Sequence, residues 1–110
     1  MGRGLEENPR AERVIPTVFR PAAAADVEDA FRWYEQQRPG LGEEFLHEPS
    51  VALNAIAENP HRFPALHRQT RRALIRRFPY GVYYRFLDTR VVVVACLHGR
   101  RDPRRWHRRK

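Results

Sequence analysis

The residues best suited to chemistry in this sequence are arginines, and they gather in its second half. They form two groups on either side of an apolar run, and the groups are Arg71, Arg72, Arg76 and Arg77, then Arg100, Arg101, Arg104 and Arg105. A guanidinium group is planar and presents its N–H donors as a fork, which pairs with a carboxylate or a phosphate in bidentate geometry. The pattern therefore predicts a surface that binds an anionic partner.

His98 is the one histidine placed where acid–base chemistry is conceivable. It ends an apolar run next to Arg100 and Arg101, and an imidazole titrates near neutral pH. The alternative is that it caps a buried strand, and we favour it because no carboxylate or second histidine is obviously placed to orient the ring. The other histidines considered, His61, His67 and His107, follow no metal-ligand spacing, so we predict no metal site and no cofactor.

Charge is distributed unevenly along the chain. The formal net charge is +8, and residues 68–110 hold 14 of the 21 basic residues but only 2 of the 13 acidic ones. Such a half is typical of a surface for nucleic acid or for an acidic protein partner. A face that only aids solubility is the alternative, but the asymmetry exceeds what solubility requires.

The composition is that of a small globular protein. With 110 residues, 42% of them hydrophobic, the chain predicts one domain over residues 13–110 after a flexible leader of residues 1–12. The single cysteine, Cys96, excludes an internal disulfide, and its Val-rich surroundings predict a buried thiol. No stretch is apolar enough for a membrane span or a signal peptide, so we expect a cytoplasmic protein that does not contact membranes.

Hydrophobic periodicity predicts the elements that position these residues. In order they are a strand within residues 13–21, a helix that ends at residues 38–42, a helix over Glu43–Asn59, a loop over residues 61–69, and strands over Arg71–Arg77, Gly81–Leu87 and Val91–Leu97. The last strand is continuously apolar, which fits a central strand buried on both faces. We predict an α+β fold with an N-terminal strand, a two-helix hairpin and a three-stranded antiparallel meander, the helices packing on one face of a small sheet.

Proline and glycine positions refine this picture. Pro16 cannot donate to a ladder, which places the first strand at an edge. Pro49 lies within the second helix, where we expect a kink or two shorter helices. Asp102 and Pro103 predict the start of a short helical turn that carries Arg104, Arg105 and Trp106.

The predicted helices and strands also indicate which way several side chains point. Side chains alternate between the faces of a strand, so at least two arginines of the Arg71–Arg77 strand point away from the helices. Tyr34 fits the apolar stripe of the first helix, which leaves Trp33 partly exposed as a contact for a partner or as a half-buried packing residue. Trp106 is either an anchor in a partner's pocket or a lid on the edge of the core.

Four motifs in this order resemble the RelE/ParE superfamily of toxins from bacterial type II toxin–antitoxin systems. They are FRPAAAADVEDAFRWYEQQRPGLGEEF (Phe19–Phe45), IAENPHRFP (Ile56–Pro64), RRALIRRFPYGVYYRF (Arg71–Phe86) and HGRRDPRRW (His98–Trp106). The resemblance implies the fold derived above and a cognate antitoxin. We predict that this antitoxin neutralises the arginine surface, and Trp33 on the first helix is a candidate contact for it. The sequences of these motifs are more similar to the ParE-like branch of the superfamily, which implies inhibition of DNA gyrase and growth arrest.

The RelE-like branch implies a different activity, ribosome-dependent cleavage of mRNA. That reaction needs a base, a cation for the phosphate and an acid, and RelE-like nucleases place lysine, arginine and tyrosine on their strands for it. When the chain is aligned with these nucleases on Tyr84 and on His98–Arg101, Arg72 and Arg101 match basic positions, and His98 is a further catalytic candidate. Leu74 and Gly81, however, stand where two more cations are expected. We therefore favour a gyrase inhibitor with no catalytic residues, and keep as alternatives an mRNA endonuclease and a degenerate, non-toxic binding module.

Overall fold

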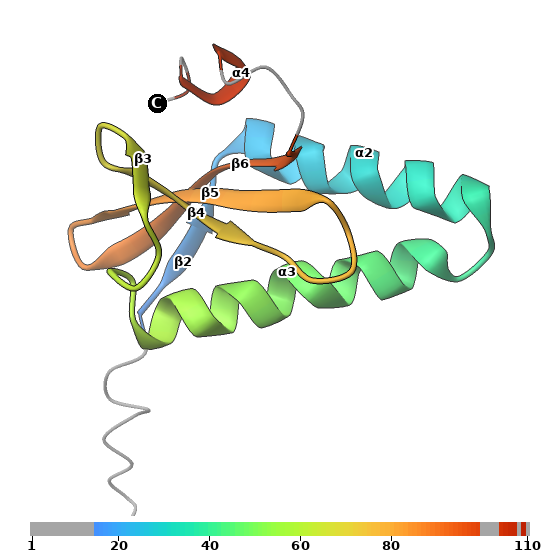
Figure 1. Cartoon of the computed structure of the whole chain (residues 1–110), viewed down its shortest axis with the longest axis horizontal. Helices are drawn as coiled ribbons and strands as arrows, with labels where there is room; N and C mark the ends of the chain where they lie inside the picture. Colours follow the sequence, from blue (N-terminus) through green and yellow to red (C-terminus); the bar gives the residue numbers. More distant parts are fainter. Residues whose placement is uncertain (1–14, 100–103, 108, 110) are drawn as a thin grey trace, which may run out of the picture.

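The computed structural model describes residues 15–99, 104–107 and 109, which form an α+β arrangement of one sheet with a helical hairpin (Figure 1). The elements in chain order are β2 (Thr17–Phe19), α2 (Pro21–Gln37), α3 (Leu41–Glu58), β3 (Ala65–His67), β4 (Thr70–Leu74), β5 (Tyr80–Leu87), β6 (Arg90–His98) and α4 (Arg104–His107). The predicted fold class and order of elements are confirmed. The predicted leader, residues 1–12, lies outside the described residues.

The sheet differs from the predicted one in two respects. Its strands lie in the order β2-β6-β5-β4-β3, so five strands take part, and β2 pairs with β6 in parallel. The extra strand, β3, falls in the segment that we expected to be a loop. It is only three residues long and follows Pro64, so its apolar run was too short to predict a strand. The parallel pair arises because the hairpin of α2 and α3 carries the chain back along the sheet before the antiparallel meander begins.

β6 is the central strand, as its continuous apolar sequence predicts. It lies between β2 and β5, and its residues Val91–Leu97 are buried. The ladder with β5 shifts register at Tyr83 and Tyr84, which pair with Ala95 and Val93. Val94 is therefore the extra residue of a β-bulge. β2 is an edge strand, in agreement with the position of Pro16.

β4 is shorter than predicted, and this moves two arginines off the sheet. The strand ends at Leu74, whereas we expected it to reach Arg77. The chain then turns: the Ile75 N–H donates to the carbonyl of Tyr80 at 3.0 Å, and Arg77 adopts a left-handed φ of 71°. Ile75 and Phe78 are buried in the core on either side of the turn, so burial of these two apolar residues ends the strand early.

Pro49 does not divide the second helix. α3 runs from Leu41 to Glu58 through a buried Pro49, so the expectation of two shorter helices is wrong. The apolar stripe on both sides of the proline explains this, because Phe45, Ala52 and Ile56 are all buried. Tertiary packing over the whole stripe offsets the roughly 3 kcal/mol that an interior proline costs.

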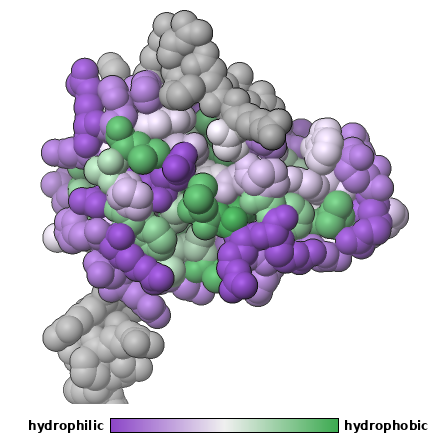
Figure 2. Space-filling model, viewed as in Figure 1, coloured by the Kyte–Doolittle hydropathy of each residue, from purple (hydrophilic) through white to green (hydrophobic). Residues whose placement is uncertain are grey.

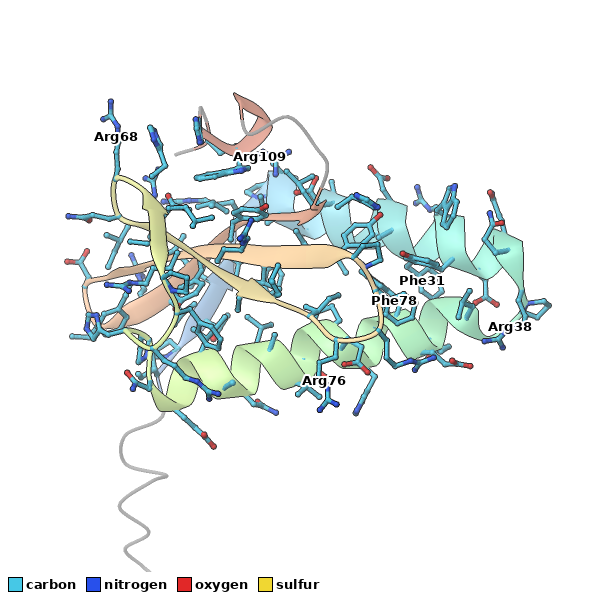
Figure 3. All side chains as sticks on the ribbon, viewed as in Figure 1. Phe31, Arg38, Arg68, Arg76, Phe78 and Arg109 are labelled. Carbon is cyan, nitrogen blue, oxygen red and sulfur yellow. The ribbon has the colours of Figure 1, made fainter. Side chains whose placement is uncertain are left out.

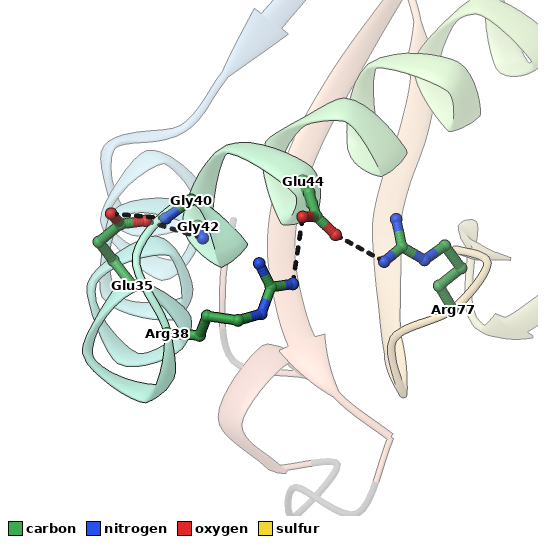
Figure 4. A network of polar contacts seen from close by, with 6 residues as sticks. All are labelled: Glu35, Arg38, Gly40, Gly42, Glu44 and Arg77. Atoms are coloured by element: carbon green, nitrogen blue, oxygen red, sulfur yellow. Dashed lines mark hydrogen bonds and ion pairs between the residues drawn. The ribbon is translucent and has the colours of Figure 1, made fainter.

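Polar contacts lock the connection between the two helices (Figure 4). Glu35 on α2 accepts from the backbone N–H of Gly40 at 3.0 Å and of Gly42 at 2.9 Å, so one carboxylate satisfies two donors at the start of α3. Gly42 lies so close to α2 that an ideal Cβ on it would come within 2.7 Å of the Phe31 ring. The hairpin is thus a close-packed unit of fixed geometry.

The sheet has an apolar core on each face. The larger core lies between the helices and the sheet and includes Tyr34, Phe45, Ile56 and Tyr84. The smaller core lies on the other face and is completed by Trp106 of α4. Figure 2 shows hydrophobic residues gathered across the middle of one view of the molecule, with hydrophilic residues around them.

Candidate functional site

Adjacent arginines on β4 point to opposite faces of the sheet. Arg71 donates from Nη1 to the carbonyl oxygens of Phe63 at 2.6 Å and His61 at 3.3 Å, so it fastens the loop before β3. Arg72 stands opposite Tyr83 in the ladder and therefore lies on the face away from the helices. Within the described part of the chain its guanidinium has no hydrogen-bonding partner. Of this pair, Arg72 alone is available to a ligand.

Arg76 lies beside α3 (Figure 3), and Arg77 lines the same pocket, together with His47 and Glu48 of α3. Arg77 donates to Glu44 Oε1 at 2.8 Å and lies over the ring of Phe78. Glu44 also accepts from Arg38 at 3.1 Å, and these two hydrogen bonds, with the charges of both arginines, lower the pKa of Glu44 (Figure 4). The expectation that the arginines of residues 71–77 share one strand is wrong, because the turn carries the second pair away.

His98 lies in a groove between α2 and the end of β6. The groove has a volume of about 610 Å³ and is lined by Asp26, Asp29, Ala30, Trp33, Tyr34, Pro79, Tyr80, Cys96, Leu97 and His98. The His98 ring meets Tyr80 edge-on with centroids 5.5 Å apart. Trp33 stands at the side of this groove and is 55% exposed, which confirms the expected orientations of Trp33 and the buried Tyr34.

One wall of the groove is the part of β6 that β2 does not cover. β2 pairs with β6 only as far as Val93, and beyond it α2 and the C-terminal segment satisfy the backbone. Asp26 accepts from the N–H of Cys96 at 3.0 Å, and Arg109 donates to the carbonyl of Val94 at 3.2 Å. Arg109 also holds Asp26 with both of its terminal nitrogens. The side chains of Asp26 and Arg109 thus bind backbone groups that a neighbouring strand would otherwise bind.

Cys96 is buried under the same groove, as its sequence context predicts. Burial, assisted by the charge of Asp26, raises the pKa of its thiol to about 12. The thiolate needed for nucleophilic or redox chemistry is therefore absent at neutral pH. Cys96 is a packing residue.

Trp106 takes the packing role of the two that the sequence left open. It is 4% exposed and stacks on Tyr83 with ring centroids 4.8 Å apart. His107 and His67 pack against its edges and stack on each other at 3.8 Å. The remaining predicted residues of this region, Arg100, Arg101, Asp102 and Pro103, lie outside the described residues, as do the side chains of Arg104 and Arg105.

Two arginines of structural importance, Arg85 and Arg109, were not predicted as site residues. Arg85 donates from Nε to the Thr70 hydroxyl at 3.0 Å and from Nη2 to the carbonyl of Arg109 at 3.3 Å. Strand alternation after Tyr83 could have placed Arg85 on the face away from the helices. The pairing of Arg109 with Asp26 spans 83 positions, and no local pattern predicts it.

The described residues offer no centre for a metal ion. Among them no group of three or more His, Cys, Asp or Glu side chains is placed to hold one. None of the helices in the described part of the chain is long and apolar enough to cross a membrane.

Comparison with known proteins places this geometry in a family. Residues 17–103 match the family model described as the ParE toxin of the type II toxin–antitoxin system parDE. The chain belongs to the ParE toxin family. A solved structure of the chromosomal ParDE toxin–antitoxin system from P. aeruginosa contains a similar chain, with a TM-score of 0.69 and 12% identity over 78% of this chain and 97% of that one. No curated protein matches the sequence closely enough to count as a relative. The predicted resemblance to the RelE/ParE superfamily, and to its ParE-like branch, is thereby confirmed.

Proposed function

We propose that this ParE-family toxin inhibits DNA gyrase by binding it and breaks no bond itself. Membership in the ParE family supports the choice of target, because ParE-like toxins act on gyrase. The proposal also includes neutralisation by a cognate antitoxin and, since both partners are intracellular, action in the cytoplasm.

The observation that carries the proposal is the surface next to Arg72. Leu74 and Gly81 are direct partners in the ladder between β4 and β5, and they stand where RelE-like nucleases have further cations. Leu74 is 64% exposed, and the aliphatic part of Arg72 lies over Gly81, within 3.1 Å of an ideal Cβ there. Neither Leu74 nor Gly81 can supply a cation to a phosphate whose charge grows during cleavage. This surface suits a protein contact better than RNA cleavage.

We also propose which residues each partner contacts. The target would meet Arg72 with the arginines that follow β6, namely Arg100, Arg101, Arg104 and Arg105. The antitoxin would occupy the groove beside Trp33, where an exposed indole offers an apolar contact. Arg71 and Arg77 are already engaged by internal acceptors, so we assign them to the fold rather than to a partner.

Two parallel reactions test the choice of target. Purified toxin, freed of antitoxin, is added to a gyrase supercoiling reaction and to a translating extract in which mRNA cuts are mapped. We expect loss of supercoiling or trapped cleaved DNA, with intact mRNA. Codon-positioned cuts that require the ribosome, with gyrase unaffected, would refute the proposal and make Arg72, His98 and Arg101 catalytic candidates. No effect in either reaction and no growth arrest on expression would indicate a degenerate binding module.

A matched pair of truncations tests the antitoxin site. Trp33→Ala removes the exposed ring beside the groove, whereas Leu66→Ala removes a residue that is 42% exposed on β3. We expect the first to weaken antitoxin binding by roughly tenfold or more, as for an aromatic anchor, and the second to leave it unchanged. Equal effects of the two substitutions would show that the groove is not the antitoxin site.

A further inference from the structure

A second cavity, distinct from the groove beside Trp33, lies between the β3–β4 turn, β5 and the C-terminal segment. Its volume is about 540 Å³, and it is lined by His67, Arg68, Gln69, Arg85, Leu87, His107 and Arg109. None of the described residues that line it is a carboxylate. In Figure 3, Arg68 projects from the tip of the β3–β4 turn, and Arg109 lies beneath α4 on the same side of the molecule. Side chains from three separate parts of the chain thus converge on one cationic hollow.

Arg85 is one of the three arginines that line this hollow. It is half-buried, and its partners are the hydroxyl of Thr70 and the carbonyl of Arg109, both neutral. A guanidinium has five N–H donors, and among the described residues three of these have no acceptor. Asp26, the carboxylate that Arg109 binds, already accepts from Arg109 itself and from the Cys96 N–H. Among the described residues, Arg85 therefore pairs with no carboxylate and keeps a free donor edge.

The two histidines of the hollow reinforce this electrostatic state. His67 and His107 stack at 3.8 Å with an interplanar angle of 12°. Burial, followed by the charges of His107, Arg68 and Arg85, lowers the pKa of His67. Protonation of His67 is therefore disfavoured, and an anion beside the ring would favour it.

We propose that this cavity binds a phosphate group, held by Arg85 from below and by Arg68 from the turn, with the imidazoles of His67 and His107 at its side. Donors that approach from several directions suit a tetrahedral phosphate, which has acceptor oxygens on every side, better than a planar carboxylate. A guanidinium fork matches two of those oxygens at once. The proposal does not depend on the choice of gyrase as target. The phosphate is either an internal phosphodiester of a nucleic acid or a terminal or free phosphate.

The test follows the ring-proton NMR signals of His67 and His107 in the full-length protein. The probes are pyrophosphate, a short single-stranded DNA, the same DNA with a 5′-phosphate, and a glutamate peptide. We expect saturable shifts of both histidines with phosphate-bearing probes only. Equal binding of the two DNAs identifies an internal phosphodiester, whereas binding of only pyrophosphate and the 5′-phosphorylated DNA identifies a terminal phosphate. Equal or tighter binding of the glutamate peptide, or no saturation with any probe, overturns the proposal.

Matched charge removals show whether binding is local. Arg68→Gln removes an exposed cation of the cavity, and we expect affinity to fall by roughly tenfold, as for a hydrogen bond to a charged group. Arg32→Gln removes the same charge from α2, where Arg32 pairs with Glu28 on the surface, and should change affinity less than twofold by comparison. Equal losses in the two variants would mean general attraction to a basic protein and would overturn the site. Arg85→Gln should also weaken phosphate binding. If the Arg85→Gln protein does not fold, the Arg68→Gln variant alone tests the site.

Discussion

Gly42→Ala tests whether the helical hairpin is as closely packed as its geometry indicates. In an open helix, alanine in place of glycine stabilises a protein by about 0.5–1 kcal/mol. Here the new Cβ would lie 2.7 and 2.8 Å from two ring carbons of Phe31 and 2.8 Å from the Phe31 carbonyl oxygen. The ring can rotate away, but the carbonyl belongs to the backbone of α2. The two helices must separate, so the sign of the effect is reversed.

The expected magnitude follows from the cost of overpacking, which is typically about 1–3 kcal/mol. We expect the free energy of unfolding to fall by about 2 kcal/mol and Tm to fall by about 10 °C, measured by urea and thermal unfolding followed by circular dichroism. Gly99→Ala is the control, because the nearest atom to its Cβ, the Pro79 carbonyl oxygen, is 3.7 Å away. If Gly42→Ala proves as stable as the wild type, the close approach of α2 and α3 is not real.

Three further substitutions or treatments probe the cores. Trp106→Ala should lower the free energy of unfolding, measured in a denaturant titration, by about 3 kcal/mol, as for a buried aromatic residue. Unchanged stability together with weaker binding to a partner protein would instead make Trp106 an anchor for that partner. Tyr84→Phe should cost about 1 kcal/mol in the same titration, because the buried hydroxyl donates to the Pro60 carbonyl at 2.6 Å, and no loss would argue against that bond. Cys96 should resist alkylation at pH 8 in the native protein and react after unfolding, since its pKa is raised to about 12; rapid native labelling, read by mass spectrometry, would contradict its burial.

The same raised pKa fixes a stability trend at alkaline pH. The unfolded thiol ionises near its ordinary value, whereas the folded thiol ionises only near pH 12. Stability from the protonated thiol is therefore complete below the unfolded pKa and is lost as the pH rises toward the folded one. Cys96→Ala should flatten the fall in Tm between about pH 8.5 and 10.5. An identical pH profile in the variant and the wild type would show that other groups control this range.

The sequence predicted those elements whose signals are local. The alternation of Trp33 and Tyr34 on a helix and the unbroken apolar run of β6 both gave the correct burial. The end of β4 was missed, because Arg76 and Arg77 continue a strand-like run while Ile75 and Phe78 turn into the core. That turn is set by contacts with distant elements, which no window of the sequence contains.

The candidate site was harder to predict because the sequence shows where arginines are but not what they contact. Arg71, Arg77 and Arg109 are engaged by a loop carbonyl, a surface glutamate and Asp26. Arg72 and Arg85 keep free donors among the described residues and lie on the face away from the helices. The arginines in the basic half of the chain thus fall into two groups. Some stabilise the fold through internal acceptors, and others remain available to bind a partner.

This grouping of the arginines makes a prediction that net charge alone does not. Arg109→Gln and Arg72→Gln remove the same charge, but Arg109 binds Asp26 and the Val94 carbonyl at an unpaired strand edge, whereas Arg72 has no such partner in the described part of the chain. Loss of Arg109 leaves a partly buried carboxylate without its cation, so we expect the free energy of unfolding to fall by about 2 kcal/mol. Arg72→Gln should leave stability unchanged and weaken inhibition of the target. If the two variants lose stability and inhibitory activity to the same extent, arginine position does not separate fold from function in this toxin.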